Sequence, residues 1–184
     1  MPRIKLSTSF PQWPLLRQTP GNSGRWGDYE VLVNQPVEEC DAWFIYDGLP
    51  HPEHTRCPPE NVVFITSEPS TFKRYHATWL RGFAQIITSQ RGLRHPRIHL
   101  GQTSLPWFVS PGYDELKCTA FPPKCRMLSA ISSKKTTTAG HRARRHFLES
   151  MQQLGVPMDL FGRGYREITD KWLGLADYRY SVAI

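Results

Sequence analysis

Short apolar runs alternate with turn-rich stretches through the first half of the chain, and this pattern predicts strands joined by loops. The run NVVFITSE at 61–68 is almost continuously apolar, which is typical of a strand buried on both faces of a parallel sheet. Proline-rich stretches favour loops, because proline suits neither a helix interior nor a central strand. The predicted strands are 4–10, 29–34, 42–48 and 61–68, and the predicted loops include 11–28 and 51–60.

An apolar residue recurs every three or four positions through residues 70–83, which predicts an amphipathic helix with Ser70 as its N-cap. A further apolar run at 84–90 predicts the next strand. Strand, helix and strand with short connections indicate a βαβ unit and therefore a parallel sheet. The predicted helical stripe consists of Phe72, Tyr75, Trp79 and Phe83.

The pattern changes after Trp107, where an irregular stretch ends in a double proline and is interpreted as a linker, residues 108–125. A polar loop at 134–141 then precedes a predicted helix at 142–155, which Gly155 ends. One face of this helix carries Phe147, Leu148, Met151 and Leu154. The remaining predicted elements are strands at 125–133, 157–162 and 178–184 and a helical turn at 168–176.

Together these elements predict an α/β protein with two parts. The first is a Rossmann-like N-terminal domain over residues 1–107, and the second is an incomplete Rossmann-like domain over residues 126–184. An apolar fraction of 39% and six Trp residues supply a packed core. No apolar run is long enough for a membrane span and the N-terminus carries no signal-peptide pattern, so we expect a soluble cytoplasmic protein without a transmembrane segment.

The net charge of +7 points to an anionic partner or to a merely basic surface, and charge alone does not separate the two. Aromatic and basic residues interleave at 70–83, as they do in some nucleic-acid-binding proteins. The aromatics there fall on one helical stripe, however, and no nucleic-acid-binding motif occurs. We therefore expect no nucleic-acid partner, and a non-catalytic α/β protein that binds nucleic acid or phosphate remains the alternative.

Glu68 stands directly after the apolar strand and before Pro69. Ligands of open parallel sheets bind beyond the carboxyl ends of the strands, where a carboxylate can act as a general base. The other interpretation places Glu68 in the first turn of the following helix, interacting with the helix dipole.

A basic segment, SSKKTTTAGHRARR, follows the strand at 125–133 and opens the next helix. Backbone N–H groups at a helix N-terminus favour anions, so a diphosphate is the predicted ligand. The Gly-Lys pattern of a P-loop is absent, and a solvated basic face is the alternative. The candidate phosphate-binding residues are Lys134, Lys135, Arg142, Arg144 and Arg145.

Two cysteines and two histidines in the first half raise the question of a zinc site. Their spacing fits no common zinc motif, so we expect no metal and four free cysteine thiols in the chain. The four residues are Cys40, His51, His54 and Cys57.

Taken together, several segments resemble the family 10 glycosyltransferases, the α-1,3/1,4-fucosyltransferases. The C-terminal half resembles the opening of their donor domain, with a strand ending in Ser-Ser, an Arg-containing helix and a final strand similar to the family's YkFsiafEN. The N-terminal half resembles their acceptor domain. The matching segments are SAISSKKTTTAGHRARRHFLESM, DLFGRGY, DKWLGLADYRYSVAI, CDAWFIYDGL, CPPENVVFITSEP and FAQIITSQ…PRIHLGQTSLPWFV.

The resemblance implies a GT-B architecture and an inverting transfer of fucose from GDP-fucose to a hydroxyl of a glycan acceptor. No cofactor beyond this donor substrate is implied. By the match of SEP, Glu68 is the implied catalytic base. By the match of the helix, Arg144 is the implied diphosphate clamp, and Arg142 or Arg145 takes that role if the match shifts.

In the family the last strand continues into Glu-Asn and then into a Thr-Glu-Lys segment that holds the nucleotide and the fucose. The sequence stops at Ile184, just before that continuation. From the resemblance we expect a fragment that is truncated within its donor-binding domain and inactive alone, with a second polypeptide as a possible source of the missing half.

Overall fold

The computed structural model describes residues 1–102 and 104–184, and these residues form two compact units, Met1–Trp107 and Phe108–Ile184. Thr103, within one of the segments that resemble the acceptor domain, lies outside the described residues. No helix in the described parts is long and apolar enough to cross a membrane.

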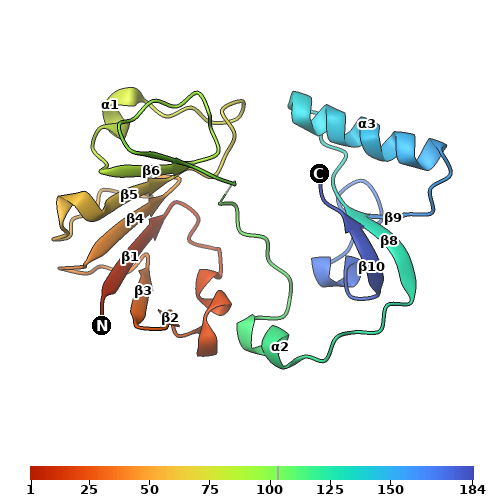
Figure 1. Ribbon diagram of the computed structural model, residues 1–184, viewed down its shortest axis with the longest axis horizontal. Coiled ribbons are helices and arrows are strands. Elements are labelled where there is room, and N and C mark those ends of the chain that lie inside the picture. Colours follow the sequence, from red (N-terminus) through yellow and green to blue (C-terminus); the bar gives the residue numbers. More distant parts are fainter. Residues whose placement is uncertain (103) are drawn as a thin grey trace. The chain divides into compact units, whose positions relative to one another are not determined.

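The first unit is built on a seven-stranded sheet with the order β2-β3-β1-β4-β5-β6-β7 (Figure 1). Every neighbouring pair is parallel except β2 and β3. The protein is therefore mixed α/β with a mostly parallel sheet, as predicted. The strands are β1 (Arg3–Thr8), β2 (Arg25–Trp26), β3 (Tyr29–Val33), β4 (Ala42–Tyr46), β5 (Val62–Ile65), β6 (Gln85–Thr88) and β7 (Ile98–Leu100).

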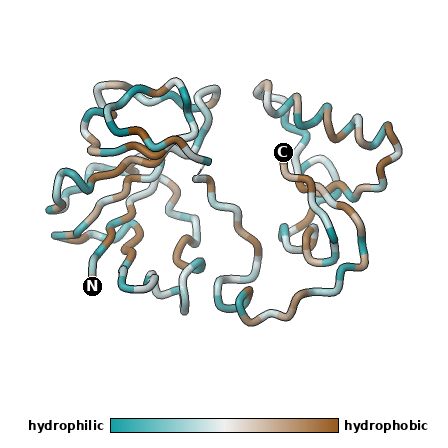
Figure 2. The backbone as a smooth tube through the Cα atoms, in the orientation of Figure 1, coloured by the Kyte–Doolittle hydropathy of each residue, from teal (hydrophilic) through white to brown (hydrophobic). Residues whose placement is uncertain are grey.

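Aliphatic and aromatic side chains of the central strands form the core of this unit. Phe64 of β5 is fully buried, and the rings of Tyr75, Trp79 and Phe83 surround it with centroids 4.6–5.0 Å away. Figure 2 shows the corresponding hydrophobic colours along the central strands, with hydrophilic colours on the loops around them. The buried core residues are Ile45, Phe64, Leu80 and Ile86.

The helix predicted at 70–83 is wrong in its length, because α1 covers only Ala77–Leu80. Its N-cap is His76 rather than Ser70, and Phe72 is 64% exposed. Long-range contacts explain the difference. The Lys73 carbonyl accepts a hydrogen bond from Gln90, and the Lys73 side chain binds Asp47, so this segment follows the sheet edge instead of a helical path.

The second unit contains a three-stranded parallel sheet with the order β10-β8-β9. Ala130 of β8, Phe161 of β9 and Leu148 of the long helix are buried in its core. The elements of this unit are α2 (Tyr113–Cys118), β8 (Arg126–Ile131), α3 (Ala139–Gln153), β9 (Asp159–Phe161), the 3-10 helix η4 (Lys171–Gly174) and β10 (Tyr178–Val182).

The long helix α3 begins three residues earlier than the pattern predicts. Thr138 accepts a hydrogen bond from the backbone N–H of His141 at 3.1 Å and so caps the helix, a role that the sequence pattern did not single out. Gly155, with a φ of +70°, follows the last turn as predicted. Within the predicted apolar face, Leu148 is buried but Phe147 and Leu154 are exposed.

The predicted linker at 108–125 is not wholly irregular, because it contains α2. The Glu115 carboxylate accepts a hydrogen bond from the Gly112 N–H at 2.7 Å, which stabilises the start of this short helix.

The last strand of the second unit, β10, is an edge strand, and β8 is its one partner strand in the described part of the chain.

Candidate functional site

Glu68 lies three residues beyond β5, at the carboxyl end of the seven-stranded sheet. It is not in the first turn of a helix, because α1 begins only at Ala77. The backbone carbonyl of Glu68 accepts a hydrogen bond from Gln90 Nε2 at 2.8 Å, which fixes the backbone. Among the described residues, no side chain forms a hydrogen bond or ion pair with the Glu68 carboxylate, and the residue is half-buried. The Glu68 backbone is thus fixed, while its carboxylate keeps its hydrogen-bonding capacity among the described residues.

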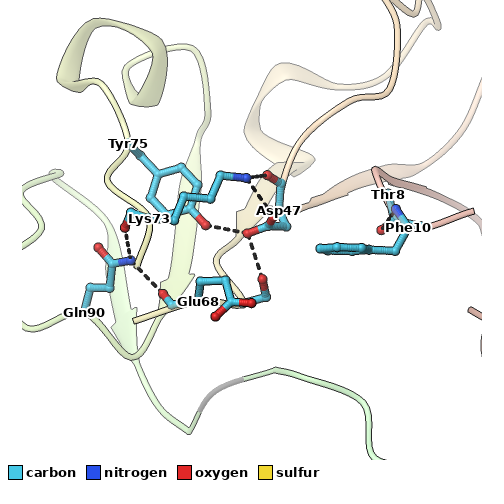
Figure 3. Close-up of polar contacts among 8 residues, drawn as sticks. Thr8, Phe10, Asp47, Glu68, Lys73, Tyr75 and Gln90 are labelled. Atoms are coloured by element: carbon cyan, nitrogen blue, oxygen red, sulfur yellow. Dashed lines mark hydrogen bonds and ion pairs between the residues drawn. The ribbon is translucent and has the colours of Figure 1, made fainter. Parts of the chain in front are cut away.

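Asp47, directly after β4, is the centre of a hydrogen-bond network beside Glu68 (Figure 3). The side chain is 4% exposed and accepts hydrogen bonds from Ser67 Oγ at 2.7 Å and from the Tyr75 hydroxyl at 2.5 Å. Lys73 Nζ donates both to the Asp47 carboxylate and to its backbone carbonyl, each at 2.7 Å. Since Ser67 precedes Glu68, this network holds the backbone that carries the candidate base.

The electrostatics of the network are set by burial and by these partners. Burial raises the pKa of Asp47, but the hydrogen bonds from Lys73, Tyr75 and Ser67 together with the Lys73 charge outweigh it, so the pKa lies below its usual value. Burial raises the pKa of Tyr46 to about 12, and the nearby charges of Asp47 and Glu68 add to the increase. Tyr46 therefore stays protonated and donates to the Ser104 carbonyl at 2.9 Å.

The sequence pattern did not predict four parts of this site: Asp47, Lys73, Tyr75 and Gln90. One signal for Asp47 was present, since it follows the apolar strand β4 just as Glu68 follows β5. Carboxyl ends of neighbouring parallel strands meet at the same edge of a sheet. No local pattern indicates the other three, because their contacts to the site span 17 to 28 residues of sequence.

We expect the substitution Asp47→Asn to lower the free energy of unfolding of the first unit by about 1.5–3 kcal/mol at pH 7, because charge-assisted hydrogen bonds are lost. Asn tolerates the left-handed backbone of this position, where φ is +62°, so the change tests the charge and not the turn. The depressed pKa means that this contribution exists above the unfolded-state pKa of about 3.9 and is lost as the pH falls through the lower folded value.

Urea titrations at a series of pH values measure this difference. Asp28→Asn, at an exposed turn residue, is the matched control and is expected to change stability by less than about 0.5 kcal/mol. A deficit of Asp47→Asn that persists unchanged below the folded pKa would show that the carboxylate charge is not its cause.

In the second unit, the loops that follow β8 and β9 run together at the carboxyl end of the three-stranded sheet. The Ser132 N–H donates to the Phe161 carbonyl at 2.8 Å, and the Lys134 N–H donates to the Arg163 carbonyl at 3.1 Å. Gly162 permits this approach, because it has a φ of +108° and a Cβ there would lie 1.9 Å from the Ser132 carbonyl oxygen. The basic start of α3 follows the first of these loops.

Three buried polar atoms on these loops and on α3 have no hydrogen-bond partner in the described part of the chain: Ser132 Oγ, Arg144 Nε and Tyr165 OH. Buried polar groups are normally paired, so three unpaired donors in one small unit require an explanation. Lys134 Nζ lies 5.1 Å from the centre of the Tyr165 ring and adds positive charge at the same loop pair. Hydroxyl and guanidinium donors of this kind are suited to bind an anion.

The five predicted phosphate-binding residues differ in their surroundings. Arg142 is exposed and donates to the Thr136 carbonyl at 2.9 Å. Arg145 Nε pairs with the Glu149 carboxylate at 2.6 Å, and this hydrogen bond, followed by the Glu149 charge, raises the Arg145 pKa. Lys134 and Lys135 are exposed. Arg144 differs from both other arginines because its buried Nε is unpaired.

The four residues considered for a zinc site do not form a metal-binding cluster among the described residues. No group of three or more His, Cys, Asp or Glu side chains suited to hold a metal ion occurs within residues 1–102 and 104–184. All four cysteines are free thiols, and Cys40 is buried. His51 and His54 instead line a cavity of about 290 Å³ beside Lys5 and Glu53.

Comparison with known proteins adds no family assignment: no protein-family model, curated protein or solved structure matches the chain.

Proposed function

We propose that the chain is a glycosyltransferase of GT-B architecture that transfers fucose from GDP-fucose, with inversion, to a hydroxyl of a glycan acceptor. The sequence resemblance supplies the reaction and the donor. The geometry supports it in two ways: the Glu68 carboxylate, at the carboxyl end of the first sheet, has no side-chain partner among the described residues, and three buried polar atoms of the second unit have none there either.

In the proposed reaction the Glu68 carboxylate takes the proton of the acceptor hydroxyl. The acceptor oxygen attacks the anomeric carbon of fucose, and the bond from that carbon to the diphosphate breaks as the new glycosidic bond forms. Negative charge develops on the departing GDP, and donors such as the Arg144 guanidinium stabilise it. Asp47 acts as a positioning residue, since it holds Ser67 and hence the backbone of Glu68.

The unpaired Nε of Arg144 is the observation that carries the proposal. A buried donor without a partner costs folding free energy, so its presence is best explained by a ligand that completes it. The Ser132 and Tyr165 hydroxyls are unpaired in the same unit, and no carboxylate forms an ion pair with Arg144 in the described part of the chain. These features favour a diphosphate over a solvated basic face.

Calorimetric titration of the full chain with GDP, GDP-fucose and UDP tests the proposal. We expect GDP and GDP-fucose to bind, UDP to bind more weakly, and Glu68→Gln to leave GDP affinity within about twofold, since the carboxylate acts on the acceptor. Where GDP release from GDP-fucose in the presence of glycan acceptors is measurable, Glu68→Gln should reduce it by about 10²-fold or more. Failure of both guanine nucleotides to bind would contradict the proposal.

The nucleic-acid alternative predicts a different result in a second experiment. A basic nucleic-acid-binding protein binds random DNA or RNA with an affinity that falls steeply with salt. We expect only weak retention in a filter-binding titration at low and moderate salt. Tight, salt-sensitive binding of random DNA would favour the alternative over the transferase.

A further inference from the structure

A short parallel pairing outside the named strands brings two cysteines to adjacent positions. Glu39 and Arg56 form an isolated parallel bridge, in which the Arg56 N–H donates to the Glu38 carbonyl at 2.8 Å and the Cys40 N–H donates to the Arg56 carbonyl at 2.9 Å. The next residue on each segment is a cysteine, Cys40 and Cys57. Paired strands lie about 4.8 Å apart, within the roughly 4.4–6.8 Å that a disulfide spans between Cα atoms.

The two thiols differ in their exposure and in their hydrogen-bond partners. Cys40 is 4% exposed, and its Sγ lies 3.8 Å from Thr55 Oγ1. Cys57 is half-buried and therefore accessible to a small reagent, and its Sγ donates to the Pro58 carbonyl at 3.6 Å. Burial, followed by the neighbouring Cys40, raises the pKa of the Cys57 thiol to about 12. Cys57 is thus mostly protonated at neutral pH, and the bridge between Glu39 and Arg56 places it beside Cys40.

We propose that Cys40 and Cys57 form a reversible disulfide, with a small-molecule disulfide such as oxidised glutathione as the oxidant. The Cys57 thiolate attacks one glutathione sulfur and releases the first glutathione thiol. The Cys40 sulfur then attacks Cys57 Sγ of the mixed disulfide and releases the second. The protein gives up two electrons and two protons, and the oxidant becomes two molecules of glutathione.

The bond would close a loop that contains β4 and Asp47. Within the segment between the cysteines, the Glu53 carboxylate also pairs with Lys5 Nζ of β1 at 2.8 Å. A disulfide at its two ends restricts the unfolded chain further. Oxidation is therefore expected to stabilise the first unit.

The experiment treats the folded full chain with oxidised glutathione and maps the peptides after alkylation of the remaining thiols. We expect two thiols to be lost, one linked peptide pair that contains Cys40 and Cys57, and a thermal midpoint that rises by several degrees and returns after dithiothreitol. The double variant Cys118→Ser/Cys125→Ser removes the two exposed cysteines and is expected to react unchanged. Cys57→Ser is expected to abolish the linked pair.

The rate at which Cys57 reacts with oxidised glutathione provides a second measurement, which does not depend on the stability of the protein. With a Cys57 pKa near 12, in the field of Cys40 and Asp41, the thiolate fraction and the rate should rise about tenfold per pH unit between about pH 7 and 10. The proposal is overturned if Cys57 stops at the mixed disulfide with glutathione, if the linked peptides contain Cys118 or Cys125, or if the pair forms only in urea.

Discussion

Lys5→Met is expected to lower the free energy of unfolding of the first unit by about 3–5 kcal/mol, because it leaves the Glu53 carboxylate buried without its counter-charge. Lys5 is 1% exposed although it lies in the middle of β1, and its Nζ is 2.8 Å from Glu53 Oε2. Ser7 Oγ donates to the same carboxylate oxygen at 2.8 Å, and Trp43 Nε1 donates to Ser7 at 2.9 Å. In Lys5→Met the Ser7 hydroxyl still donates to Glu53, but a neutral hydroxyl does not balance the carboxylate charge. The folded state is therefore destabilised relative to the unfolded state.

Hydrogen exchange of the β1 and β4 amides measures this change, and the β8 amides of the second unit serve as an internal control. The double variant Lys5→Met/Glu53→Leu removes both charges and should regain most of the lost stability. Arg56→Ala breaks the ion pair with Glu39, which is 3.3 Å long and joins exposed side chains, so it should cost less than about 1 kcal/mol. Equal effects of Lys5→Met and Arg56→Ala would contradict the role assigned to burial.

Lys5 also illustrates a limit of sequence-based prediction. The strand that contains it could be predicted, because Ile4, Leu6 and the following residues have strand preferences. A lysine in such a strand is expected to face solvent. Its burial depends on Glu53, which lies 48 residues later in a proline-rich loop, and no local pattern pairs the two.

The candidate site likewise contains features with a local sequence signal and features without one. Glu68 and Asp47 each follow a buried apolar strand, and that signal is local. The helix predicted at 70–83 is shorter than predicted for a reason that is not local. The side chain of Lys73 and its carbonyl bind groups on two other loops. Helical periodicity indicated the aromatic core contacts of Tyr75, but not the contact of its hydroxyl with Asp47.

In the second unit, the basic charge of the α3 start could be read from the sequence, but the difference between its arginines could not. Arg144 and Arg145 are neighbours with the same chemistry. An acidic residue four positions after Arg145 forms an ion pair with it, whereas Nε of Arg144 is buried without a partner. Of the three arginines at the start of α3, Arg144 is thus the one whose buried Nε has no partner among the described residues.

Arg144→Met is expected to weaken GDP binding by roughly thirtyfold or more, which corresponds to about 2 kcal/mol for a lost charge-assisted contact. The same substitution should leave the stability of the second unit unchanged or slightly higher, because the removed Nε has no partner among the described residues. This combination distinguishes a ligand-binding arginine from a structural one. Loss of a structural arginine would reduce both the GDP affinity and the stability of the second unit. Arg144→Lys should recover little affinity, since an ammonium group does not reproduce the planar guanidinium donors.

Arg142→Met and Arg145→Met are the matched controls on the same helix. Arg142 is exposed and donates to the Thr136 carbonyl, and Arg145 forms an ion pair with Glu149. Each substitution should therefore change GDP affinity by less than about threefold at moderate salt, because exposed charges are screened there. Calorimetry at two salt concentrations makes the comparison. Equal losses for all three variants, disappearing together at the higher salt, would show a diffuse basic surface instead of a diphosphate clamp. A loss confined to Arg144 that persists at the higher salt is the expected result, because a contact made by a buried donor is screened much less than one at an exposed charge.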